Sequence, residues 1–215
     1  MQIDPTEARL RVARMFLRAR QPLGAAVVLA ELARRGNRDP EVWCGLGAAL
    51  LGSRGALVVK PFELWAARVL REAEPLVFGT PFAQTRLELE RGLPPPATAE
   101  PMDAVALDEL IPYLLVTDDV LPGAIDGLPA DDRMFAVMML ADHSGHALPV
   151  IRAAIRGRWG PPAARAALKR CGRFLDRVDL RAAITAAGGS PGHDELEPYL
   201  GHVLDQIRAH DAERG

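Results

Sequence analysis

The chain has 215 residues, of which 26 are basic and 28 acidic, so its formal net charge is −2. That length buries enough apolar surface to fold without disulfides or metals. The two cysteines, Cys44 and Cys171, have the spacing of neither a disulfide framework nor a metal knuckle. No stretch approaches the roughly 18 consecutive apolar residues of a membrane span, and the N-terminal residues lack the apolar core of a signal peptide. We therefore expect a cytoplasmic protein with free thiols.

The pattern of apolar residues predicts an all-α fold. Apolar side chains recur at three- and four-residue spacing, and the period-two alternation of strands is almost absent. Pairs such as Asp4-Pro5 and Asp39-Pro40 are typical helix starts. The expected helices span 5–20, 22–35, 40–52, 61–74, 81–91, 103–117, 120–127, 131–142, 146–158, 161–175, 178–187 and 194–211.

A proline-rich segment at 92–101 interrupts this series, because its prolines lack the amide hydrogen that a helix needs. It predicts a linker between a repeat region at 1–91 and a second helical region at 102–215. Alternatively, the linker joins two parts of one continuous helical stack.

Two segments of the first region repeat one another. Residues 23–31 and 64–72 share Leu, Ala, Ala, Val, Leu and Glu at identical spacing. Each follows a proline and an amphipathic helix, so the repeating unit is a helical hairpin. The two Asp-Pro pairs, at 4–5 and 39–40, mark unit starts that lie 35 residues apart.

The second unit carries motif residues of a known repeat. Trp43, Leu46 and Gly47 stand at a W-x2-L-G spacing. Further along, Ala66, Leu70 and Ala73 follow an A-x3-F-x2-A spacing, with Leu in place of Phe. Residues 5–91 therefore resemble the tetratricopeptide repeat (TPR) family, whose unit is about 34 residues long. The resemblance implies an α-solenoid-like stack of antiparallel helical hairpins.

The sequence departs from that family in two places. The loop at 52–59 makes the second unit about six residues too long, and Leu10 stands where the first unit would have Trp. An ordinary antiparallel bundle is the alternative. In the second region, helices such as 146–158 and 161–175 resemble HEAT-type stacking in rhythm alone, and a compact bundle has the same pattern.

The TPR resemblance implies a binding groove. In that family the second, fifth, ninth and twelfth positions of each unit face a concave surface. With Leu10 and Trp43 as fourth positions, these are Ala8, Arg11, Met15, Arg18, Glu41, Cys44, Ala48 and Leu51. On a helical wheel Arg11, Arg14 and Arg18 also share one face.

Arg11 and Arg18 beside Met15 predict a partly basic groove for an acidic or C-terminal peptide, because guanidinium groups pair well with carboxylates. A solvated helix face would look the same. The Asn and Lys clamp for a terminal carboxylate is absent, since Asn37 is the only asparagine. We therefore disfavour an adaptor for chaperone tails.

A second basic face offers an alternative. Arg165, Lys169, Arg173 and Arg177 recur at four-residue steps, with Arg170 nearby. Such an array could contact phosphates in a HEAT-like nucleic-acid-binding protein. The acidic C-terminal half, however, makes a solvated helix face the simpler interpretation. We therefore do not expect nucleic acid as the partner.

No pattern predicts catalysis, a cofactor or a metal site. Phosphate-binding loops, nucleophile elbows and paired CxxC motifs are missing. His143 and His146 are separated by Gly145, with no further ligand nearby in sequence. The last helix, 195–208, has a broad apolar face that either caps the array or forms a homodimer interface.

Only Lys60 and Lys169 of the 26 basic residues are lysines, a bias typical of a GC-rich, bacterial genome. We therefore expect no enzyme but a bacterial protein-interaction adaptor or scaffold. Its groove would bind a segment of another protein, and it could regulate a partner enzyme or switch protein. The alternative is the nucleic-acid-binding function of the face at 165–177.

Overall fold

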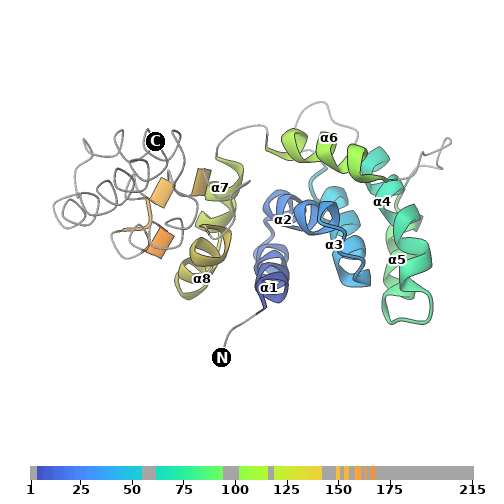
Figure 1. Ribbon diagram of the computed structural model, residues 1–215, viewed down its shortest axis with the longest axis horizontal. Coiled ribbons are helices and arrows are strands. Elements are labelled where there is room, and N and C mark those ends of the chain that lie inside the picture. The colour runs from blue at the N-terminus through green and yellow to red at the C-terminus, as the bar shows by residue number, and fades with distance from the viewer. Residues whose placement is uncertain are drawn as a thin grey trace, which may run out of the picture. The chain divides into compact units, whose positions relative to one another are not determined.

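The computed structural model describes residues 4–54, 62–93, 102–115 and 119–141, and isolated residues between 149 and 167. All regular structure in these residues is helical, which confirms the predicted all-α class. The helices are α1 (Pro5–Arg18), α2 (Pro22–Arg34), α3 (Pro40–Gly52), α4 (Phe62–Val77), α5 (Phe82–Arg91), α6 (Ala104–Leu114), α7 (Val120–Asp126) and α8 (Ala130–Ala141) (Figure 1). Most of each helix expected at 146–158, 161–175, 178–187 and 194–211 lies outside the described residues.

The chain forms two compact units, Met1–Leu128 and Pro129–Gly215. In the first unit, α1 to α5 pack against one another in sequence order, and both α6 and α7 pack on α2. The first unit therefore continues past the segment at 92–101, where we expected a boundary. Whether that segment joins parts of one continuous helical stack stays a prediction.

In the second unit α8 is the only continuously described helix. Ala136, Val137, Leu140 and Ala141 are buried and share one face of α8, as expected for an amphipathic helix.

Aspartate caps set where several helices begin. The Asp4 carboxylate accepts a hydrogen bond from the amide of Thr6 at 3.3 Å, and Asp39 accepts one from Glu41 at 2.8 Å. Asp103 does the same for the amide of Ala106 at 2.8 Å. These bonds satisfy amide groups that have no partner within the helix. The predicted Asp-Pro starts of α1 and α3 are thereby confirmed.

Helix α4 continues to Val77 and includes Pro75, although we expected it to end at residue 74. A proline within a helix removes one backbone hydrogen bond and distorts the turn before it. Here the Arg86 guanidinium from α5 donates to the carbonyl oxygen of Leu70 at 3.0 Å and pairs with Glu90 at 2.7 Å. Arg86 thus supplies a hydrogen bond to α4 close to the proline and fixes α5 beside it.

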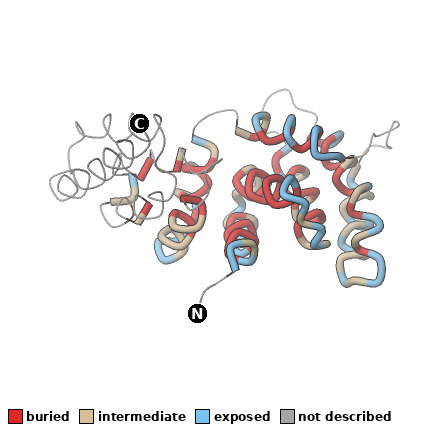
Figure 2. The backbone as a smooth tube through the Cα atoms, in the orientation of Figure 1, coloured by how far each residue is buried: buried red, intermediate tan, exposed pale blue. Residues whose placement is uncertain are grey.

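Helix α2 is the centre of the first unit. Ten consecutive residues, from Gly24 to Ala33, are buried (Figure 2), because α1, α3, α6 and α7 all pack against this helix. Even Glu31 is buried, with a side chain that is 2% exposed, and its carboxylate pairs with Arg34 and Arg35 at 2.8 and 2.9 Å. A helix that is buried on every side needs covering helices on every side.

Glycine allows the closest helix approach between α3 and α4. A Cβ atom added at Gly47 would lie 2.6 Å from Leu70 Cδ2, and Leu70 is fully buried, so it has little space to move. The glycine of the W-x2-L-G spacing therefore has a packing role.

We expect Gly47→Val to lower the free energy of unfolding by about 1–3 kcal/mol, because the new side chain overpacks the α3–α4 contact. Urea unfolding followed by circular dichroism measures this. Gly123→Val is the matched control, because a Cβ atom at Gly123 in α7 has no neighbour within 4 Å. Equal losses in the two variants would contradict the packing argument.

Candidate functional site

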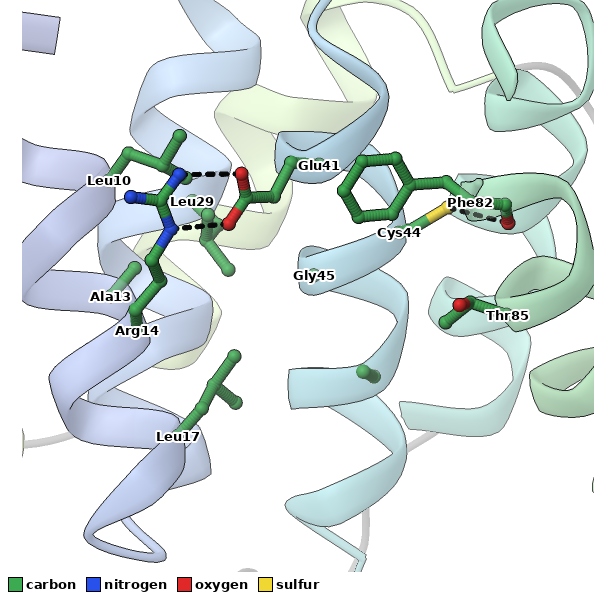
Figure 3. Close-up of a pocket in the computed structure, with 11 residues that line it drawn as sticks. Leu10, Ala13, Arg14, Leu17, Leu29, Glu41, Cys44, Gly45, Phe82 and Thr85 are labelled. Carbon is green, nitrogen blue, oxygen red and sulfur yellow. Dashed lines mark hydrogen bonds and ion pairs between the residues drawn. The ribbon is translucent and has the colours of Figure 1, made fainter. Parts of the chain in front are cut away.

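The first unit contains an apolar groove between α1, α3 and α5 (Figure 3). Its volume is about 190 Å³. The residues that line it are Leu10, Ala13, Arg14, Leu17, Leu29, Glu41, Cys44, Gly45, Ala48, Phe82 and Thr85. Seven of these eleven residues have apolar side chains, and apolar atoms make up nearly all of the lining surface. The groove therefore offers contact to a hydrophobic group rather than to a charged one.

On α1 and on α3 the residues that line the groove recur at helical spacing. On α1, Leu10, Ala13, Arg14 and Leu17 recur at three- and four-residue spacing and so share one face. Glu41, Cys44, Gly45 and Ala48 do the same on α3, Leu29 of α2 lies between the two helices, and Phe82 and Thr85 come from α5. The small side chains on α1 and α3 leave the space between these helices open.

The predicted positions on α3 agree with this lining. Glu41, Cys44 and Ala48 all contact the groove, whereas Leu51 is partly buried but does not line it. The sequence register therefore located the groove-facing side of α3.

On α1 the predicted register is one residue off. Leu10, Arg14 and Leu17 line the groove where we expected Arg11, Met15 and Arg18. Met15 is buried, with 7% of its surface exposed, and Ala8, at the remaining predicted position, is buried as well. One residue is a rotation of about 100° on an α-helix, so the predicted set lies on a neighbouring face.

A different alignment would have found this face. The prediction aligned Leu10 with Trp43, which are 33 residues apart. An offset of about 34 residues, the unit length of the TPR family, instead places Leu10, Arg14 and Leu17 at the predicted positions, and all three line the groove. The unit length of the family was thus the better guide to register. Phe82 and Thr85 also line the groove, and no motif residue on α5 predicted them.

An ion pair spans the groove between α1 and α3. The Arg14 guanidinium donates two hydrogen bonds to the Glu41 carboxylate, at 2.5 and 2.6 Å, and a third to Glu7 at 2.9 Å (Figure 3). Hydrogen bonding to Glu41 is the main reason that the pKa of Arg14 is raised. Because two carboxylates already bind this guanidinium, the groove lining presents no unpaired positive charge at Arg14.

Cys44 lies in the groove wall with 2% of its surface exposed. Burial raises the pKa of its thiol, and the positive charge of Arg86 opposes this in part. The sulfur lies 3.9 Å from the Phe82 carbonyl oxygen, which it faces as a weak donor. Such a thiol is a poor nucleophile, since the reactive form is the thiolate.

Arg11 and Arg18 are exposed, and each follows a groove-lining residue of α1 in sequence. They contribute positive charge next to the groove rather than inside it. The alternative basic face at Arg165, Lys169, Arg170, Arg173 and Arg177 lies outside the described residues, as does the final helix at 195–208.

Other kinds of site were sought in the same part of the chain. No cluster of three or more His, Cys, Asp or Glu side chains occurs among the described residues. None of the described helices has the length and apolar character needed to cross a membrane.

Comparison of the chain with protein-family models, with curated proteins and with solved structures finds no match.

We expect Cys44 to react with iodoacetamide at pH 8 at least about tenfold more slowly in the native protein than in urea, because burial disfavours its thiolate. Mass spectrometry of the digested protein measures this, since it separates the Cys44 peptide from that of Cys171. Similar rates in the two conditions would mean that the groove wall is open to solvent at Cys44.

The Arg14–Glu41 pair should couple α1 to α3 weakly. A double-mutant cycle of Arg14→Met and Glu41→Gln should give a coupling free energy of about 0.5–1.5 kcal/mol, because both side chains are partly exposed. Added salt should reduce it. Arg18→Met, on an exposed position of the same helix, is the control and should show no coupling to Glu41→Gln.

Proposed function

We propose that the protein is a non-catalytic interaction module whose groove binds one large apolar side chain of a protein segment. The groove itself carries this proposal, because its lining is almost wholly apolar and its volume is about 190 Å³. Sites for drug-sized molecules are larger, about 300–1,000 Å³. A single side chain is therefore the better match, and buried anchor side chains dominate many protein interfaces.

The arrangement of helices supports interpreting this part as TPR-like. Helices α1 and α2 pack as neighbours, as do α3 and α4, and the groove lies along the first helix of each pair. On this proposal the protein acts as an adaptor or scaffold, and its client could be an enzyme or a switch protein.

The charge beside the groove suggests what surrounds the anchor. Arg18 is exposed, so acidic residues that flank the apolar side chain of the partner would be attracted to it. Arg14 is engaged by Glu41 and Glu7. We therefore propose an apolar anchor with acidic neighbours, and not a carboxylate that enters the groove.

A substitution that fills the groove tests this proposal. Ala48→Phe adds a ring at a partly exposed position in the groove wall, and it should abolish capture of the partner by the immobilised full-length protein. Ala104→Phe adds the same ring at an exposed position of α6 and should leave capture unchanged. Quantitative mass spectrometry of the captured proteins compares the two variants with the unmodified protein.

Circular dichroism checks that both variants fold. The double substitution Arg11→Glu with Arg18→Glu should lower the affinity for the same captured protein about tenfold or less. The reason is that exposed charges contribute less to binding than a buried anchor. If Ala48→Phe and Ala104→Phe capture the same proteins in the same amounts, the groove is not the binding site.

A further inference from the structure

An aromatic ring projects from the turn between α4 and α5. Phe78 has 90% of its surface exposed, more than any other large apolar residue in the described part of the chain. Transfer of an exposed phenyl ring from water into an apolar site is favourable. The hydrogen bonds around Phe78 determine how firmly the backbone that carries this ring is held.

The turn that carries Phe78 is well ordered by hydrogen bonds. The Thr80 hydroxyl donates to the Val77 carbonyl oxygen at 2.7 Å and accepts from the Phe82 amide at 3.2 Å. The Thr80 amide also donates to the Val77 carbonyl oxygen, at 2.9 Å. Gly79 provides the positive φ of 74° that the turn requires. The backbone that carries Phe78 is therefore fixed in a defined turn, and little backbone entropy is lost when the ring is bound.

The groove of the same chain has the size and chemistry for such a ring. An apolar cavity of about 150 Å³ is enough to hold benzene, and the groove measures about 190 Å³. Leu17 and Leu29 provide aliphatic contacts, and Phe82 provides an aromatic one. Two aromatic rings in one site prefer offset or edge-to-face contact.

The charges near Phe78 and those near the groove have opposite signs. Glu74 lies one helical turn before Phe78, and its side chain is 64% exposed and pairs with Arg86 at 3.4 Å. Arg86 also pairs with Glu90 at 2.7 Å, so these three side chains together keep one negative charge. Arg11 and Arg18 lie next to the groove. Phe78 with Glu74 thus has the form that we proposed for the partner, an apolar anchor with an acidic neighbour.

We propose that the occupant of the groove is Phe78 of a second copy of this chain. This inference rests on the proposed function, because it names the partner of the same groove. The chain carries both the anchor and the groove, so two copies can exchange anchors in a closed dimer, or successive copies can associate head to tail. A net charge of −2 opposes such association only weakly.

The experiment measures self-association of the full-length protein by sedimentation velocity, from low micromolar to near-millimolar concentration. The unmodified protein should show a mass that rises with concentration above the 23.2 kDa of the single chain. Phe78→Ser and Ala48→Phe should each raise the dissociation constant about tenfold or more, since one removes the anchor and the other fills the groove.

Two controls and a mixing experiment make the result specific. Val105→Ser removes another exposed apolar side chain, 65% exposed on α6, and Ala104→Phe adds a ring outside the groove; both should associate like the unmodified protein. When Phe78→Ser and Ala48→Phe are mixed, each provides what the other lacks. The mixture should therefore form a one-to-one complex that neither variant forms alone.

A monomeric mass at every concentration would overturn the inference, and so would a mixture that does not associate. Association that Phe78→Ser leaves intact would overturn it as well. In each of these cases the proposed function survives if Ala48→Phe still abolishes capture of another protein. If Ala48→Phe changes neither capture nor self-association, both proposals fail.

Discussion

The first unit depends on the complete burial of α2. Ten consecutive residues of this helix are buried, and α1, α3, α6 and α7 cover it. Because α1 and α3 both pack on α2, they diverge at the groove and leave a space whose base is Leu29 of α2. Small residues, among them Ala13 and Ala48, keep that space from filling. The groove is thus a consequence of how a central helix is covered.

The sequence predicted the helices well and the boundary between units less well. Helix starts were predictable because the caps and prolines that fix them are local, as at Asp4 and Asp39. The partition of the chain was not, since a proline-rich segment ends a helix but does not prevent the next helix from packing on an earlier one. Packing of α6 on α2 joins residues roughly 80 positions apart, and no local pattern encodes such a contact. Pro75 was misleading for a related reason, because Arg86, which supports the helix around it, comes from another helix.

Part of the position of the groove could be predicted from the sequence, but the polarity of its lining could not. Glu41 and Ala48 line the groove, whereas on α1 the lining residues Leu10 and Leu17 each lie one position before the expected Arg11 and Arg18. The basic groove expected from sequence is therefore an apolar one with basic residues beside it. The ion pairing of Arg14 could not be predicted from the sequence either, because its main partner, Glu41, lies on a different helix. An ion pair of this kind changes the ligand that a site accepts, since a guanidinium that already holds carboxylates has little affinity left for another.

The burial of α2 also has a consequence for how the protein is made. A nascent chain emerges from its N-terminus, so α2 is synthesised long before α6 and α7, which cover part of its surface. During that interval an apolar side of α2 has no cover from its own chain. Folding units that wait for distant segments are slow to complete and prone to aggregate. The first unit should therefore reach its native state only after residue 128 has left the ribosome.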